Sequence, residues 1–186
     1  MRVALRQLTP VNGPPIPVPD PDRLTHLQFR RFAGCPVCNL HIQSLLRRRD
    51  EIEAAGVREV LVFHSSVAEL REQDLPFTVI ADPGKRLYVE FGVESSPRAL
   101  LNPRVWLPII RAVARSLVAV ARGREKAPGG NPDGGRLGLP ADFLIAPDGT
   151  VVASKHGTHA YDQWSVDEIL AQAGKHRLVR SDDTPM

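Results

Sequence analysis

The hydrophobic and polar positions of the chain switch between strand and helix periods in its first half. Residues 25–33 alternate, with Leu27 and Phe29 between polar neighbours, which is the period of a strand. Residues 37–55 instead carry apolar side chains at helical spacing, and the apolar run at 58–63 is typical of a strand buried on both faces. Strand, helix and strand of these lengths predict a βαβ unit.

The later pattern predicts shorter elements of the same two kinds. Ser66 favours a helix start, and Ser165 with Glu168 forms a capping box at the start of a terminal helix that we expect to end at Ala173. The elements expected after the βαβ unit are a helix over 67–73, a strand over 77–80, a helix over 85–91, strands over 141–145 and 151–153, and the terminal helix. Alternating strands and helices predict an α/β fold with a central mixed sheet flanked by helices.

Proline sets the organisation of the N-terminal segment. Residues 10–22 are rich in proline, which fixes φ and lacks an N–H donor, so we expect an extended arm or an edge strand. We therefore divide the chain into an arm (1–24), a domain (25–176, with an insertion at about 102–138) and a polar tail (177–186).

The insertion contains a strongly apolar stretch at 104–122 that predicts an inserted helix. Arg104, Arg111, Arg115 and Arg122 share one face of it, which argues against a membrane span. We expect the helix to pack on the domain, while a homodimer interface or a surface that meets anionic lipid remain alternatives. The glycine-rich residues 123–138 predict a loop.

Composition excludes several classes of function. The chain has 186 residues, 42% of them hydrophobic and 24% charged, as in a packed domain. A net charge of +3, without a platform of aromatic and basic residues, argues against binding to nucleic acid.

No apolar stretch reaches the roughly 18 residues of a membrane span, so no stable membrane insertion is expected. The N-terminus lacks the apolar run of a secretory signal, so we expect a cytoplasmic protein. Without a G-x-G-x-x-G or P-loop motif, we expect no bound cofactor.

The chain has two cysteines, Cys35 and Cys38, in a C-x-x-C motif between a predicted strand and a predicted helix. Cys35 should lie at the helix N-terminus, where unpaired N–H groups and the helix dipole stabilise a thiolate. We expect Cys35 to be the exposed nucleophile, with a lowered pKa. Cys38, one turn further on, should be the more buried thiol that resolves a mixed disulfide.

Two alternatives to a redox enzyme remain open. One is a redox sensor or binding module whose Cys35–Cys38 disulfide changes its surface without turnover. The other is a metal site in which a histidine joins both cysteines; His41 continues the motif as C-x-x-C-x-x-H, and the further candidates are His64, His156 and His159. His41 is otherwise expected on the helix surface.

Other residues near the motif have simpler interpretations. Arg30, Arg31 and Arg98 could each supply positive charge to a thiolate, but each is expected to be a surface residue. Tyr161 and Trp164 are expected to pack rather than to contact a substrate.

Four segments carry a resemblance to a known family: FRRFAGCPVCNLHI, REVLVFHSS, LPADFLIAPDGTVVA and YDQWSVDEIL. They resemble bacterial peroxiredoxin-like proteins of the AhpC/TSA (alkyl hydroperoxide reductase/thiol-specific antioxidant) group that carry C-x-x-C, over about residues 10–175. The resemblance implies a thioredoxin-like fold, reduction of peroxides or disulfides, and a thiol reductant such as a thioredoxin system. It also implies that Pro140, before the strand at 141–145, is cis and lies against the redox cysteines.

The chain departs from the family at one motif. Typical members carry Pro-x-x-x-Thr-x-x-Cys, but the proline and threonine positions hold Gln28 and Phe32. The threonine hydroxyl helps to hold peroxide against the thiolate, and phenylalanine cannot do so. The sequence therefore supports dithiol chemistry at Cys35 and Cys38, and leaves peroxides and disulfides both open as oxidising substrates.

Overall fold

A computed structural model describes residues 1–73, 75–93 and 138–182, together with the isolated positions 110, 113, 114, 117, 118 and 122. The inserted helix expected at 104–122 and the loop expected at 123–138 lie almost wholly outside the described residues, as does Arg98. They remain predictions.

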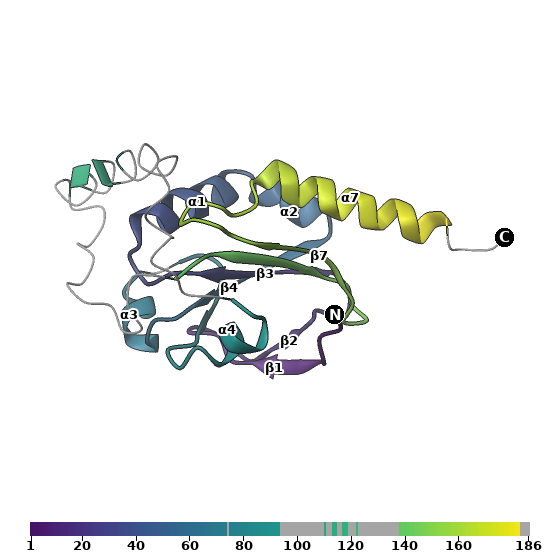
Figure 1. Ribbon diagram of the computed structural model, residues 1–186, viewed down its shortest axis with the longest axis horizontal. Coiled ribbons are helices and arrows are strands. Elements are labelled where there is room, and N and C mark those ends of the chain that lie inside the picture. Colours follow the sequence, from purple (N-terminus) through teal and green to yellow (C-terminus); the bar gives the residue numbers. More distant parts are fainter. Residues whose placement is uncertain are drawn as a thin grey trace.

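The centre of the fold is a five-stranded mixed sheet in the order β5-β4-β3-β6-β7 (Figure 1). Strands β3, β4 and β5 are parallel, whereas β6 is antiparallel to both β3 and β7. The strands are β3 (Leu24–Arg30), β4 (Val57–Phe63), β5 (Thr78–Ala81), β6 (Ala141–Ile145) and β7 (Val151–His156). The expected α/β fold with a central mixed sheet is confirmed, and β3 is its middle strand.

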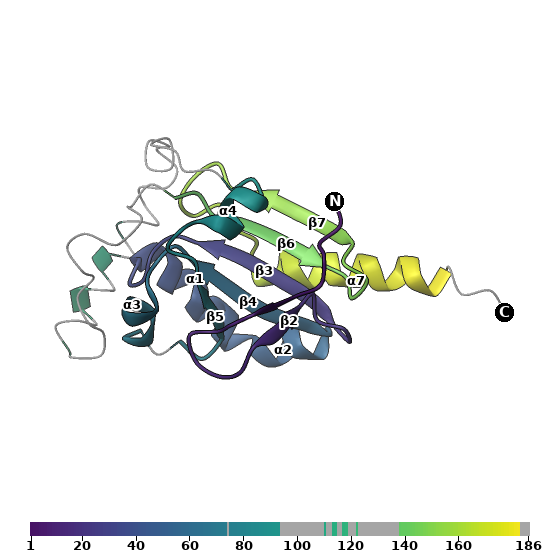
Figure 2. The ribbon, with the colours of Figure 1, turned by 90° about the horizontal axis from the view of Figure 1, so that it is seen from below.

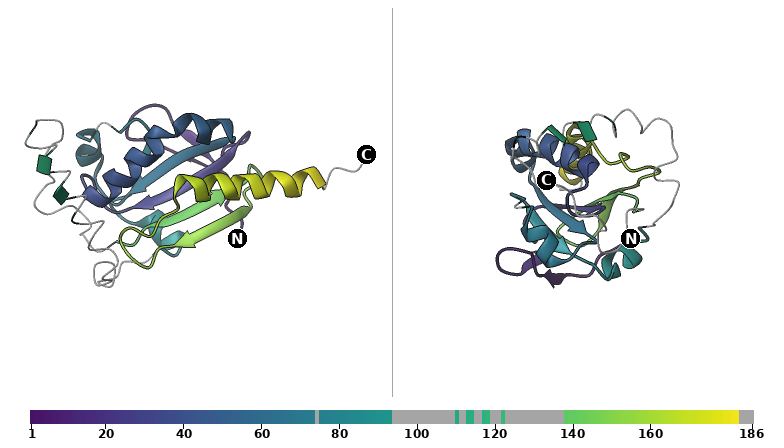
Figure 3. Two further views of the ribbon diagram at one scale, coloured as in Figure 1. Left: turned by 90° about the horizontal axis from the view of Figure 1, so that it is seen from above. Right: turned by 90° about the vertical axis from the view of Figure 1, so that its left-hand side faces the viewer.

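Helices and a small ribbon cover the two faces of this sheet. Helices α1 (Pro36–Arg47), α2 (Arg49–Ala54) and α7 (Val166–Asp182) lie over one face (Figures 1 and 3). Helix α4 (Arg86–Glu90) and the antiparallel ribbon of β1 (Arg6–Leu8) and β2 (Ile16–Val18) lie over the other, which Figure 2 shows from below. The short helix α3 (Val67–Arg71) lies beside β5.

The helices differ from the sequence prediction in their bounds. The helix expected over 37–55 is divided at Arg48, whose φ of −123° and ψ of 25° leave the helical region. The terminal helix begins with the predicted capping box, in which the Glu168 N–H donates to Ser165 Oγ and the Ser165 N–H to Glu168 Oε2. It continues beyond the expected end at Ala173, so the tail expected from 177 begins inside a helix.

The proline-rich arm packs against the rest of the protein. The Val11 N–H donates to the Val79 carbonyl at 2.8 Å, and the Val3 N–H donates to the Gly149 carbonyl at 2.8 Å. Gly149 has a φ of +88°, and a Cβ there would lie 2.3 Å from the Val3 carbonyl oxygen, so only glycine permits this close approach. The arm thus contacts both β5 and the turn between β6 and β7.

Strand β3 is buried along its whole length. Leu27 and Phe29 enter the core on the β1–β2 side, where the Phe29 and Phe143 ring centroids lie 5.7 Å apart. The alternate residues His26, Gln28 and Arg30 face the helices on the other side. The alternation in the sequence therefore separates two buried faces, one apolar and one polar.

Candidate thiol active site

The C-x-x-C motif lies where the middle strand passes into the first helix, as predicted. Cys35 is the N-cap of α1, with an extended φ of −62° and ψ of 115°, and Pro36 occupies the first turn. The Asn39 N–H donates to the Cys35 carbonyl at 2.9 Å, which is the first bond of the helix. Gly34 makes the turn before it, with a φ of 71°.

Both thiols are free and buried, with Cys35 1% and Cys38 2% exposed. The expectation that Cys35 is exposed is wrong, because apolar side chains pack around both sulfurs. We call this group the thiol cluster; it consists of Phe32, Cys35, Val37 and Cys38, with Leu40 and Tyr161 packed against it. The expected packing role of Tyr161 is confirmed.

A hydrogen bond joins the two thiols and shifts their pKa values in opposite directions. It lowers the pKa of Cys38, which the positive charge of Arg31 also favours, to about 6 despite burial. The same hydrogen bond, together with burial, raises the pKa of Cys35 well above its ordinary value. The prediction of a lowered pKa at Cys35 is therefore wrong. Two sulfurs share one proton and titrate as a unit, which holds a single negative charge near neutral pH.

Arg31 is the cation next to this charge, with its Nη1 3.9 Å from Cys35 Sγ. Arg30 and Arg31 are 0% and 5% exposed, so the expectation that they are surface residues is wrong. The reason is their place at the end of the middle strand. There the His64 N–H donates to the Arg31 carbonyl, and a Cβ on Gly138 would lie 3.0 Å from His64 Nε2. Three chain segments therefore converge beside the thiols.

Pro140 lies at the same end of the sheet as the cysteines, because Ala141 pairs with Phe29 at the end of β3. Its carbonyl accepts from the Gly157 N–H at 2.8 Å. The cis isomer implied by the family resemblance is contradicted: the only cis peptide bond among the described residues joins Val18 and Pro19. The trans form is the default for an X-Pro bond by about 0.5–1 kcal/mol, and nothing in the local sequence of Pro140 specified otherwise.

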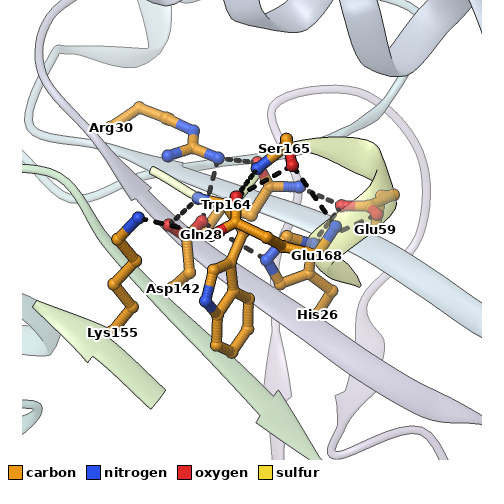
Figure 4. Close-up of polar contacts among 9 residues, drawn as sticks. All are labelled: His26, Gln28, Arg30, Glu59, Asp142, Lys155, Trp164, Ser165 and Glu168. Carbon is orange, nitrogen blue, oxygen red and sulfur yellow. Dashed lines mark hydrogen bonds and ion pairs between the residues drawn. The ribbon is translucent and has the colours of Figure 1, made fainter. Parts of the chain in front are cut away.

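Five side chains form a closed polar circuit on the helix-facing side of the sheet, which we call the buried ion network (Figure 4). Arg30 donates to Gln28, Gln28 donates to Glu59, and His26 Nδ1 lies 2.9 Å from Glu59 Oε2. His26 Nε2 lies 3.3 Å from Asp142 Oδ1, which also accepts from Arg30 Nη2 at 3.0 Å. The two cations and two carboxylates leave the network with no net charge.

The network fixes the protonation of its members. Burial alone would lower the pKa of His26, but the Glu59 and Asp142 carboxylates outweigh it and raise that pKa to about 9. Burial would raise the pKa of Asp142, yet Arg30 and His26 hold it well below its usual range. The Asp142 carboxylate also accepts from the Trp164 backbone N–H at 3.0 Å. Trp164 is buried, which confirms its expected packing role.

His41 is buried as well, at 4% exposed, so its expected place on the helix surface is wrong. It lies on α1 one turn after Cys38, on the side that faces the sheet. Burial and the charge of Arg30 hold its pKa well below its ordinary value. Its Nε2 atom is buried and has no hydrogen-bond partner among the residues that the structure describes.

A family model described as AhpC/TSA antioxidant enzyme matches residues 44–159, more than half of the chain. The chain belongs to the AhpC/TSA antioxidant enzyme family. The matched residues begin after Cys38, so membership does not rest on the cysteines. They include Pro140 and Asp142.

Solved structures share the fold of this AhpC/TSA protein. Peroxidoxin BcpB from Mycobacterium tuberculosis is 15% identical with a TM-score of 0.61, over 94% of this chain and 95% of that chain. The reduced 2-Cys peroxiredoxin of Plasmodium vivax is 14% identical with a TM-score of 0.67, over 97% and 82%. A putative thiol:disulfide interchange protein DsbE from Chlorobium tepidum is 17% identical with a TM-score of 0.55, over 93% and 96%. These likenesses confirm the thioredoxin-like fold. A search of curated protein sequences found no match.

Two further observations concern the alternatives raised by the sequence. Among the described residues of this AhpC/TSA protein, no three or more His, Cys, Asp or Glu side chains gather as a metal site would require. Within the same residues, no helix is long and apolar enough to cross a membrane.

The buried ion network is the feature that sequence reasoning missed. A signal was present, because Asp142 stands in the otherwise apolar strand ADFLI. The polar residues of β3 alternate with apolar ones, and both sets are buried only because β3 is the middle strand, which the pattern of one strand alone does not reveal.

Proposed function

We propose that this AhpC/TSA protein is a thiol oxidoreductase in which Cys35 and Cys38 form the redox-active pair. The observation that carries the proposal is their hydrogen bond at the N-terminus of α1, where the pair holds one negative charge beside Arg31. A thiolate is the nucleophile of disulfide exchange, and a second thiol in contact can complete the reaction.

The reaction proceeds in three steps. The proton that the two sulfurs share first passes from Cys35 to Cys38. The Cys35 thiolate then attacks one sulfur of a substrate disulfide, forms a mixed disulfide and expels a thiolate. Cys38 then attacks the Cys35 sulfur, closes the Cys35–Cys38 disulfide and releases the second substrate thiol. An external thiol reductant such as a thioredoxin system restores both thiols. Cys35 is the attacking residue in this proposal because it precedes the helix, next to Arg31, whereas Cys38 lies within the first turn. Pro140, at the same end of the sheet, flanks the site.

Phe32 favours disulfides over peroxides as the oxidising substrate. It occupies the position where the family motif has threonine, and its side chain is packed inside the thiol cluster at 7% exposed. A phenyl group offers no hydrogen bond to a peroxide oxygen, so the thiolate would face peroxide without that support. We therefore propose that peroxide reacts slowly and a disulfide reacts fast.

Intact-mass spectrometry of the reduced protein tests these assignments. Equimolar disulfide should remove two hydrogens from the wild type, whereas Cys38→Ser should stop at a mixed disulfide on Cys35. Equimolar hydrogen peroxide should give the same bridge at least tenfold more slowly. If neither oxidant forms the bridge, the proposed function is wrong. If Cys35→Ser traps the substrate and Cys38→Ser does not, Cys38 is the attacking residue.

A further inference from the structure

We propose that residues 104–122, which we call the inserted segment, bind to the surface of a membrane that contains anionic lipid. The proposal is independent of the thiol chemistry, because it uses no residue of the thiol cluster. It begins from apolar side chains that the fold does not cover.

Four apolar side chains of the inserted segment are exposed at positions with helical backbone. Ile110, Val113, Leu117 and Val118 are 59%, 42%, 65% and 47% exposed. The Arg122 N–H donates to the Val118 carbonyl at 3.1 Å, as in a helix. Figures 1 and 2 draw these positions in green, at the end of the molecule where α3 lies. At these positions the segment does not bury its apolar side chains against the domain.

The four apolar side chains lie on one side of a helix. Successive residues turn by about 100°, so Ile110, Val113 and Leu117 fall within about 60° of one another, and Val118 lies about 80° from Ile110. Single exposed apolar residues are common on protein surfaces, but a continuous exposed row is typical of an interaction surface. The row therefore indicates a partner that covers it.

Arginines give this surface its second property. Arg122 is exposed, and Arg104, Arg111 and Arg115 precede it by 18, 11 and 7 residues, each close to a whole number of helical turns. A continuous helix would therefore carry all four in one row, about 120° from Ile110. The segment contains no Asp or Glu, and its four arginines exceed the net charge of +3 of the whole chain. The net positive charge of the protein thus resides in this segment.

An apolar row beside a row of arginines fits the surface of an anionic membrane. The apolar side chains would enter the boundary between headgroups and acyl chains, and the arginines would reach the lipid phosphates and carboxylates. The arginines also keep the segment at this boundary and out of the hydrocarbon core. A second copy of the chain fits less well, because two paired inserted segments contain no carboxylate to compensate their arginines.

Co-sedimentation of the full chain with lipid vesicles tests the proposal. Vesicles of phosphatidylcholine with about 30 mol% phosphatidylserine should bind the protein at least tenfold more tightly than vesicles of phosphatidylcholine alone. Binding should weaken steeply as sodium chloride rises from about 50 to about 500 mM, because salt screens the charge of the lipid surface.

Two double variants separate the charged contribution from the apolar one. Arg111→Gln with Arg115→Gln should weaken binding to the anionic vesicles about 30-fold, as expected for the loss of two cations near such a surface. Ile110→Asn with Leu117→Asn should weaken it at least tenfold, because less apolar area enters the membrane.

The matched control changes two apolar side chains of comparable exposure elsewhere. Leu5 and Val89 are 69% and 79% exposed, the first in the arm and the second on α4. Leu5→Asn with Val89→Asn should bind the anionic vesicles like wild type. A loss of binding equal to that of Ile110→Asn with Leu117→Asn would overturn the assignment to the inserted segment.

The remaining outcomes also decide the proposal. Equal binding to both kinds of vesicle, or no binding to either, overturns it. It is also overturned by a wild-type dimer in sedimentation velocity that does not bind vesicles and that Ile110→Asn with Leu117→Asn converts to monomers, since the partner is then a second copy. Ile110 and Leu117 are exposed, so the urea midpoint of this variant should match wild type. If a variant unfolds, the lipid and salt dependence of wild type decides alone.

Discussion

The thiol cluster and the buried ion network are neighbours, because Arg31 lies beside Cys35 and the adjacent Arg30 belongs to the network. They differ in how the charges are compensated. In the network Asp142 contacts two cations and a backbone N–H, and His26 lies between two carboxylates. In the thiol cluster two sulfurs share one proton, with Arg31 Nη1 3.9 Å away.

Because of this difference, the buried ion network should contribute to stability and the thiol cluster to reactivity. Removing one member of a buried ion pair leaves a charge without a partner, so such groups are held in place and do not react. A thiol pair with one incompletely compensated negative charge is a poised nucleophile instead. The comparison predicts that substitutions in the network should change folding and substitutions near the thiols should change chemistry.

The largest expected effect is on the network. Asp142→Asn removes the charge that compensates Arg30 and His26, and breaking a buried pair in this way costs about 3–5 kcal/mol of unfolding free energy. Glu90→Gln is the matched control, because Glu90 pairs with Arg6 at the surface, where such pairs contribute about 1 kcal/mol or less. Urea unfolding followed by tryptophan fluorescence measures both. Equal losses in the two variants would contradict the distinction between the regions.

The next effect is a pH dependence of stability caused by His26. The folded protein raises the pKa of His26 from 6.5 to about 9, so its contribution is complete below pH 6.5 and is lost as the pH rises toward 9. Integrated over that interval, the loss of unfolding free energy is about 3 kcal/mol. Cys38 acts in the opposite sense, because its lowered pKa adds stability as the pH rises above 6.

The double variant Cys35→Ser, Cys38→Ser removes the contribution of the thiols and leaves the pH dependence of stability that is due to His26. Urea unfolding of this variant between pH 6 and 9.5 should show a steeper fall in stability than the wild type. A flat profile would mean that His26 is not protonated in the folded protein.

The smallest expected effect concerns the thiols themselves. Arg31→Gln removes the cation beside Cys35 Sγ and should raise the first pKa of the thiol pair by about one unit, which corresponds to about 1.4 kcal/mol. Ultraviolet absorbance of the thiolate during a pH titration measures this pKa. The rate at which the reduced protein attacks 5,5′-dithiobis(2-nitrobenzoate), followed by the coloured thiolate that this reagent releases, should fall at neutral pH and recover at high pH. An unchanged pKa would show that Arg31 does not act on the pair.

The sequence predicted those parts of the protein that depend on local patterns. The βαβ unit, the strands β6 and β7, the helix start at Ser66 and the capping box at Ser165 follow from periodicity and from side chains near in sequence. The position of Cys35 before Pro36 at a helix start follows in the same way. Each depends on residues a few positions apart, so neighbours in sequence contain the information.

The errors share a different origin. Arg30, Arg31, His41 and Cys35 were all expected nearer the surface, and all are buried because β3 became the middle strand, between β4 and β6. Burial of this kind depends on which strands flank a residue, and a pairing such as Gln28 with Asp142 joins positions more than a hundred residues apart. The pKa order of the two thiols was missed for the same reason, since it depends on a contact between side chains and on Arg31.

The contacts of the arm with β5 and with the β6–β7 turn bear on the order of folding events. Arg2 Nε donates to the Asp148 carbonyl across a separation of 146 residues, and Val3 bonds to Gly149. A ribosome extends the chain from the N-terminus, so Arg2 and Val3 emerge long before their partners have been synthesised. Contacts between such distant positions also close slowly. We therefore expect the arm to dock in the last step of folding, after the β3–β4 pairing that brings Cys35 to its place.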